Sequence, residues 1–143
     1  MIALVDKLAQ LRAALRQNSI DACVLPSSDP HLGEYITDHW KVIQWLTGFT
    51  GSSSTVIITD SFAGLWTDSR YFIQAEKELE GSGFHLVKSS GLKPQDYIDF
   101  LADELMEGSR IAVDGSIFPL PKLRSIEKRV STGNITITFS CDF

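Results

Sequence analysis

Hydrophobic residues recur along the chain at alternating helical and extended spacings. The first stripe consists of Leu4, Leu8, Leu11 and Leu15. Steps of three and four residues place these leucines on one face of a helix that ends near Ser19. Residues 20–25 then form a short apolar run stopped by Pro26, which is typical of a strand buried on both faces. A helix followed by a buried strand indicates an α/β protein.

A turn-rich stretch follows this first strand. Residues 26–30 contain two prolines, a serine pair and an aspartate, which favour a loop at the carboxyl end of the strand. A short helix is expected over 39–46; it breaks at 47–51, and small residues fill the loop that follows. The inward side chains of this helix are expected to be Trp40, Ile43 and Leu46.

Two β-rich runs, 55–59 and 63–67, are separated by only three residues, which predicts an antiparallel hairpin. Asp68 or Ser69 can cap the next helix, which ends at 81–83. Its inner face would consist of Phe72, Ala75 and Leu79. The later elements are strands at 84–88, 110–114 and 135–140, and helices at 94–106 and 119–130. The pattern predicts one α/β domain, with a mixed six-stranded sheet and helices on both faces.

Length and composition agree with this reading. The chain has 143 residues, 43% hydrophobic and 22% charged, which suits one folded domain. Its net charge of −5 disfavours nucleic acid as a partner. One stretch, 122–129, carries Lys122, Arg124, Lys128 and Arg129 against Glu127. A solvated helix face is the simple explanation for these cations, and the sequence assigns them no function.

The amino end and the cysteines indicate a soluble, cytoplasmic protein. Charged residues interrupt the amino-terminal apolar stretch, so it lacks the pattern of a signal peptide, and no apolar run is long enough for a membrane span. Cys23 and Cys141 have no metal-binding spacing, and each lies in a strand-like run. We expect two reduced thiols packed as small apolar groups and no membrane partner.

Several motifs invite a chemical interpretation that their context disfavours. The glycine- and serine-rich segment 48–54 precedes a strand and lacks a lysine, whereas a phosphate loop follows a strand and opens a helix. Asp29, His31, Glu34 and His39 do not have the spacing of a metal site, so capping groups in a loop are the simpler reading. His85 is read as a hydrogen-bonded structural histidine. The runs ACVL at 22–25 and TVIIT at 55–59 also contain no carboxylate, whereas a ribonuclease H-type nuclease needs carboxylates on its strands to hold two metal ions.

The most informative segment is the corner from Trp66 to Tyr71. A strand ends there, and a helix begins with Asp68, Arg70 and Tyr71 nearby. Open α/β sheets usually bind ligands at the carboxyl ends of their strands. A structural alternative remains, in which Trp66 and Tyr71 are core residues, Asp68 caps the helix, and Arg70 pairs with a surface carboxylate.

Three segments of the chain resemble the amino-terminal, creatinase-type domain of the Xaa-Pro aminopeptidases (aminopeptidase P). They are PSSDPHLGEYI at 26–36, GFTGS at 48–52 and LWTDSRYFIQA at 65–75. Ser69 stands where many relatives have glycine. The resemblance implies the creatinase/prolidase N-terminal fold, which is ribonuclease H-like, over residues 1–143.

The resemblance also implies that this chain is a non-catalytic lobe of a longer hydrolase. In that family, a carboxyl-terminal domain binds two divalent ions, commonly manganese, and removes the first residue from peptides with proline second. This lobe would help to form the substrate cleft and the subunit contacts of a homo-oligomer, in the simplest case a dimer. Its partners would be its own catalytic domain, a second lobe and the peptide substrate, and the lobe itself would hold no metal or other cofactor.

The residues expected at that cleft or domain boundary are Arg70, Trp66, Tyr71, Asp68 and His31, with Arg70 first among them. Two other readings stay open. The chain could be the lobe of a creatinase or Xaa-Pro dipeptidase relative, or a free-standing ligand-binding or interaction module.

Overall fold

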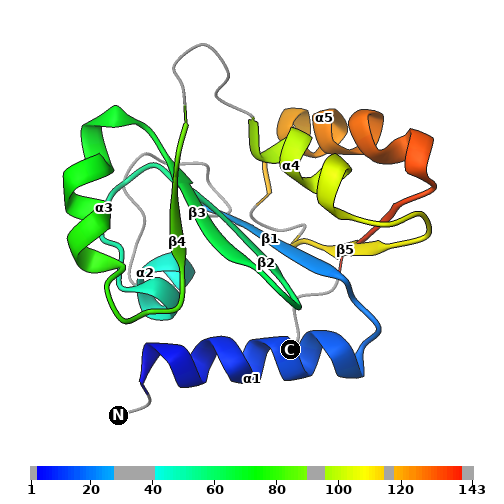
Figure 1. Ribbon diagram of the computed structural model, residues 1–143. Coiled ribbons are helices and arrows are strands. Elements are labelled where there is room, and N and C mark those ends of the chain that lie inside the picture. The colour runs from blue at the N-terminus through cyan, green and yellow to red at the C-terminus, as the bar shows by residue number, and fades with distance from the viewer. Residues whose placement is uncertain (1–2, 28–40, 90–95, 115–117, 140–143) are drawn as a thin grey trace.

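Six strands form one mixed sheet in the computed structural model, which describes residues 3–27, 41–89, 96–114 and 118–139 (Figure 1). The strands are β1 (Ala22–Pro26), β2 (Thr55–Thr59), β3 (Ala63–Thr67), β4 (His85–Lys88), β5 (Arg110–Ala112) and β6 (Thr136–Thr138). Their order across the sheet is β4-β3-β2-β1-β5-β6. The predicted mixed six-stranded sheet is therefore confirmed.

Strand direction determines where the loops of the sheet gather. β2 is antiparallel to both β1 and β3, while β1 pairs with β5, β5 with β6, and β3 with β4 in parallel. Every strand except β2 therefore runs the same way. The five parallel strands end at one edge of the sheet, which we call the carboxyl edge, and β2 begins there.

Helices cover both faces of the sheet. They are α1 (Leu4–Gln17), α2 (Val42–Thr47), α3 (Phe72–Glu78), α4 (Asp96–Glu104) and α5 (Leu120–Val130). Figure 1 shows α2 and α3 on one side, α4 and α5 on the other, and α1 running across the lower end. Two apolar clusters fill the layers, one with Leu8 and Ala75 beneath α1 and α3, the other with Leu101 and Ile126 beneath α4 and α5.

Most elements match the sequence prediction, and their ends differ for local reasons. β1 includes Pro26, although the first strand was expected to stop before it. Pro26 faces Thr55 in a pair without ladder hydrogen bonds, because the flanking hydrogen bond joins the Ser27 N–H to the Ser54 carbonyl. On its other side β5 reaches only as far as Cys23, so the missing proline N–H removes no ladder bond.

The buried side chains follow the predicted pattern where the structure describes them. Ile43 and Leu46 of α2 are buried, whereas Trp40 lies outside the described residues. Ala75 of α3 and Leu79, directly after it, are buried as expected, whereas Phe72, the third residue predicted for that face, is only half-buried. Cys23 is a buried free thiol, and Cys141 lies outside the described residues.

Candidate functional site

The candidate site lies at the carboxyl edge of the sheet. β3 ends at Thr67 and continues through Asp68 into a 3₁₀ turn, Ser69–Tyr71, that leads directly into α3. β1 ends at Pro26 beside the segment 48–54, which enters β2 from the same edge. Three sequence-distant segments therefore meet where α/β sheets commonly bind their ligands.

Asp68 and Arg70 form a hydrogen-bonded unit at this corner. The Asp68 side chain caps the 3₁₀ turn, since its Oδ1 accepts the Arg70 backbone N–H at 3.0 Å. The Arg70 guanidinium then donates from Nε to Oδ1 and from Nη2 to Oδ2, both at 2.9 Å. These hydrogen bonds, led by those from the guanidinium, lower the pKa of the Asp68 carboxyl. The carboxylate thus orients the arginine in a bidentate pair.

Tyr71 extends this unit toward the neighbouring loop. The Arg70 guanidinium carbon lies 5.1 Å from the centroid of the Tyr71 ring, within cation–π range. The Tyr71 hydroxyl is 2.5 Å from the Ser52 Oγ, and the Phe49 ring packs edge-on against the tyrosine at 5.8 Å. Phe49 is buried, so the tyrosine has an apolar side in the core and a hydroxyl at the edge.

The loop from Gly48 to Ser54 is held by a carboxylate. Glu78 accepts the Thr50 backbone N–H at 2.8 Å and the Thr50 hydroxyl at 2.6 Å. The Gln74 amide donates to the Thr50 Oγ1 at 2.8 Å. A phosphate loop would direct such amides at an anionic ligand. Here the Glu78 carboxylate of the protein itself accepts the Thr50 N–H. This geometry supports the interpretation of a tightly packed turn.

Gly51 is required by packing within this loop. A Cβ built on Gly51 would lie 2.2 Å from the Cζ of Phe49, far inside contact distance. Further hydrogen bonds tie the loop to its neighbours, from the Thr67 hydroxyl to the Ser53 carbonyl at 2.7 Å and from the Ser54 N–H to the Ser27 Oγ at 3.0 Å. The segment is therefore fixed to the ends of β1 and β3.

Trp66 lies apart from the polar corner. Successive strand residues face opposite sides of a sheet, so Trp66 points to the α4 side while Thr67 points to the α3 side. The indole is 4% exposed and packs on Phe100 at 5.1 Å and Phe62 at 6.1 Å. Trp66 is thus a core residue in this structure, as the structural alternative held, whereas Asp68, Arg70 and Tyr71 come together.

The other candidates are placed as follows. His31 lies outside the described residues, as do Asp29, Glu34 and His39. His85 is exposed on β4 and stacks on Phe62 with ring centroids 5.5 Å apart. Sequence reasoning did not find the hydroxyl contact between Ser52 and Tyr71, because nothing in the pattern indicates that positions 19 residues apart meet.

The described residues hold neither a metal-ligand cluster nor a membrane-spanning helix. Within residues 3–27, 41–89, 96–114 and 118–139, no group of three or more His, Cys, Asp or Glu side chains is placed to hold a metal ion. Those residues therefore do not fit the ligand set of a two-metal centre. No helix in the same ranges is both long and apolar enough to cross a membrane.

Comparisons with known proteins agree on one family. The family model of the creatinase/prolidase N-terminal domain matches residues 7–139. Aminopeptidase P2 of Arabidopsis thaliana is 31% identical over 136 residues, which cover 94% of this chain and 19% of the relative. Xaa-Pro aminopeptidase 2 of Homo sapiens is 32% identical over 127 residues, which cover 89% of this chain and 18% of the relative. The chain spans about a fifth of the length of these curated relatives.

A solved structure is similar over the same region. The X-prolyl aminopeptidase of Caenorhabditis elegans, a cytosolic enzyme with a di-nuclear active site, superposes with a TM-score of 0.85 at 32% sequence identity. The match covers 96% of this chain and 24% of that enzyme. Sequence, family model and fold therefore agree over nearly the whole chain, which belongs to the creatinase/prolidase N-terminal domain family.

Proposed function

We propose that residues 1–143 are the non-catalytic amino-terminal domain of a longer Xaa-Pro aminopeptidase. The parent enzyme removes the first residue from peptides whose second residue is proline. In this proposal the domain forms one wall of the substrate cleft and contributes to contacts between subunits. Catalysis belongs to a carboxyl-terminal domain outside these residues.

The observation that best supports the proposal is that the structural match covers nearly all of this chain but only a small part of the matched enzyme. Nearly all of this chain, 96%, corresponds to only 24% of the Caenorhabditis elegans enzyme. That proportion is what an accessory domain of a much larger peptidase would give. A similarly small share recurs in the curated relatives, of which this chain covers 18% and 19%.

The proposal places the metal chemistry elsewhere in the parent enzyme. The described residues do not fit a two-metal centre. Two divalent ions, manganese in our proposal, would therefore be bound by the carboxyl-terminal domain. The remaining partners are a second lobe of similar fold, the peptide substrate and further copies of the parent enzyme in a cytoplasmic homo-oligomer.

Within this domain, the Asp68–Arg70 unit is the proposed contact with substrate or with a neighbouring domain. The Arg70 side chain is 63% exposed, although its Nε and Nη2 both donate hydrogen bonds to the Asp68 carboxylate. A cation held in one orientation at the carboxyl edge suits a peptide carboxylate or an acidic side chain. The hydroxyls of Tyr71 and Ser52 lie beside it as further polar groups.

The test compares the purified 143-residue chain with the product of the complete open reading frame. A fluorogenic Xaa-Pro peptide is supplied to each preparation with manganese and with a chelator. The longer protein should release the first residue in a manganese-dependent manner, and the isolated chain should release none in either condition. Metal-dependent hydrolysis by the isolated chain, or a stop codon close after Phe143, would contradict the proposal.

A further inference from the structure

Tyr71 connects the Asp68–Arg70 unit to the loop at 48–54. The centroid of its ring lies 5.1 Å from the guanidinium carbon of Arg70, and its hydroxyl lies 2.5 Å from the Ser52 Oγ. These two contacts join segments that lie on opposite sides of the β2–β3 hairpin in the sequence. The tyrosine is therefore placed to contact the arginine and the loop at the same time.

The Asp68 carboxylate by itself does not fix the plane of the Arg70 guanidinium. It accepts hydrogen bonds from Nε and Nη2, which lie on one edge of that group. Two contacts along one edge leave rotation about the edge possible, because a hydrogen bond tolerates a range of angles. The Arg70 side chain is 63% exposed, so its surroundings restrict this rotation only in part. The Tyr71 ring supplies a contact away from the edge, since the guanidinium carbon lies over it.

The Tyr71 ring is held at both of its ends and on one side. Its backbone N–H donates to the Asp68 carbonyl at 3.0 Å, and its hydroxyl contacts the Ser52 Oγ at the far end. The buried Phe49 ring packs edge-on against it, with ring centroids 5.8 Å apart. The ring is therefore fixed more firmly than the exposed arginine that lies beside it.

The loop that carries Ser52 is attached on both sides of this serine. On one side, Glu78 accepts two hydrogen bonds from Thr50. On the other side, the Thr67 hydroxyl donates to the Ser53 carbonyl at 2.7 Å. The serine hydroxyl thus lies at a defined place relative to α3 and the end of β3, and it fixes the position of the tyrosine hydroxyl.

From these contacts we propose that Tyr71 is a positioning residue, which holds the Arg70 guanidinium in one orientation for the ligand contact proposed above. Ser52 acts through Tyr71, because its hydroxyl holds the far end of the ring. An arginine that is already oriented loses less side-chain entropy when it binds. The consequence for the parent enzyme rests on the proposed function of Arg70, whereas the orientation belongs to this domain alone.

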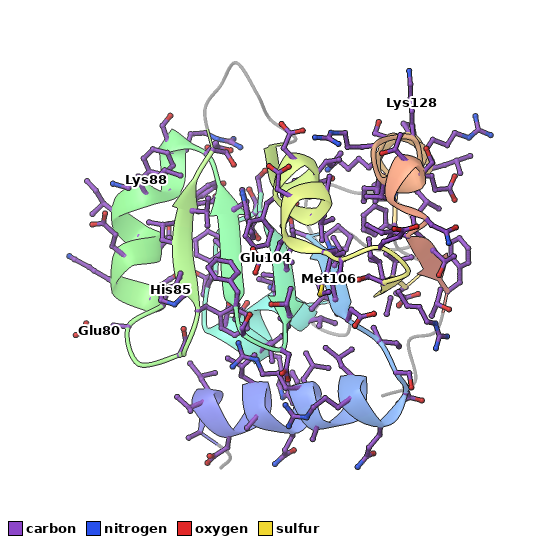
Figure 2. The ribbon with its side chains drawn as sticks, turned by 45° about the vertical axis from the view of Figure 1, so that its right-hand side comes forward. Glu80, His85, Lys88, Glu104, Met106 and Lys128 are labelled. Carbon is purple, nitrogen blue, oxygen red and sulfur yellow. The ribbon has the colours of Figure 1, made fainter. Side chains whose placement is uncertain are left out.

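The order of the Arg70 side chain tests the orientation in the 143-residue chain. The measurement is the {1H}–15N nuclear Overhauser effect (NOE) of the Arg70 Nε–H, which reports motion on the picosecond-to-nanosecond scale. Tyr71→Leu should lower this NOE, and Tyr71→Phe, which retains the ring, should preserve most of it. Phe72→Leu is the matched control. The Phe72 ring lies 5.4 Å from the Nζ of Lys88 at the end of β4 (Figure 2), so its loss removes a different cation–π contact and should leave Arg70 unchanged.

Kinetics of the parent enzyme test the consequence for the reaction. Tyr71→Leu should lower kcat/KM for an Xaa-Pro peptide about two- to fivefold, which corresponds to the loss of an exposed cation–π contact. The double variant Arg70→Ala, Tyr71→Leu should be no worse than Arg70→Ala, because Tyr71 acts only through the arginine. Ser52→Ala and Tyr71→Phe should have equal and smaller effects, since both remove the same hydroxyl contact.

An unchanged Arg70 NOE in Tyr71→Leu would overturn the proposal. Additive losses in the double variant would also overturn it, because Tyr71 would then act through the packing of the core. If Arg70→Ala leaves kcat/KM unchanged, the proposed ligand contact of Arg70 fails. The NOE comparison would still decide whether Tyr71 orients the arginine, so the two failures can be told apart.

Discussion

Arg70 donates three hydrogen bonds to the Asp68 carboxylate, one from its backbone N–H and two from its guanidinium. A cation at the amino end of a helix normally opposes the helix dipole. Here the carboxylate that caps the turn also neutralises that cation, so the conflict is resolved locally. The pair presents an oriented arginine at the carboxyl edge of the sheet.

Arg70→Ala in the parent enzyme should lower kcat/KM for Xaa-Pro peptides. Loss of one charge-assisted hydrogen bond in a cleft corresponds to about tenfold or more. Metal content should stay the same, and the free energy of unfolding should fall by less than about 1 kcal/mol, because the residue is mostly exposed and loses only its pair with Asp68. Arg16→Ala is the matched control, since Arg16 forms an exposed ion pair with Asp60 at the opposite edge of the sheet. Equal kinetics for both variants and the wild type would leave Arg70 with a structural role only.

The acid stability of the domain should depend on Asp68. Its folded-state pKa is lowered, chiefly by the side-chain hydrogen bonds from Arg70, so folding favours the ionised form. This contribution is fully present above the unfolded value of 3.8 and is lost as the pH falls through the lower folded value. Because the pair is partly exposed, we expect less than about 1 kcal/mol.

Urea unfolding across the acidic range measures this contribution. Below pH 3.8 the wild type loses the stability that Asp68 contributes. Asp68→Asn should remove this contribution from the pH dependence of the free energy of unfolding. Arg70→Ala should reduce the same contribution, because it removes the main cause of the shift. Identical pH profiles for the wild type and Asp68→Asn would refute the assignment.

Gly51→Ala should destabilise the domain. The new methyl group would meet the buried Phe49 ring, and relieving such overpacking typically costs about 1 to 3 kcal/mol. Gly133→Ala is the control, since its Cβ would lie at an ordinary 3.4 Å from the nearest side chain. Chemical denaturation of both variants checks the difference. Equal free energies of unfolding would show that Phe49 moves aside at no cost.

Glu78→Ala should loosen the loop before β2. The substitution leaves the Thr50 N–H and hydroxyl without their acceptor, at a cost of about 1 to 2 kcal/mol for exposed groups that water can partly satisfy. Glu80→Ala, just beyond the same helix, removes an exposed carboxylate of equal charge and should be near neutral. Amide hydrogen exchange at Thr50 should accelerate only in the Glu78 variant. Unchanged exchange at Thr50 would show that the hydrogen bonds to Glu78 do not hold this loop.

Cys23 should resist alkylation in the folded protein. Burial raises the pKa of its thiol to about 12, so almost no thiolate exists at pH 8. A Cys141→Ser background allows iodoacetamide labelling to report on Cys23 alone. Labelling should be slow in native buffer and fast in denaturant. Fast native labelling would mean that the strand opens readily, contrary to its central position in the sheet.

Local patterns were enough to predict the elements of this fold. The leucine stripe of α1, the short spacing of the β2–β3 hairpin and the buried face of α3 all reflect interactions between near neighbours in the chain. The three motifs quoted for the family were also local, and the match of the family model over residues 7–139 confirms the family that they indicated. The pattern places Pro26 just beyond the first strand, whereas it is the last residue of β1, because whether a proline removes a ladder bond depends on which strands flank it.

Only the tertiary structure decided which side chains share the candidate site. Trp66 and Arg70 are four positions apart, yet strand alternation sends the indole into the core while the turn after β3 leaves the guanidinium at the surface. Ser52 and Tyr71 meet because β2 and β3 pair and carry their flanking segments to one edge. The sequence alone determined the elements, since helix and strand periodicity are local. The site depends on the order of the strands and on the face of the sheet to which each side chain points. Both arise from pairing between distant segments.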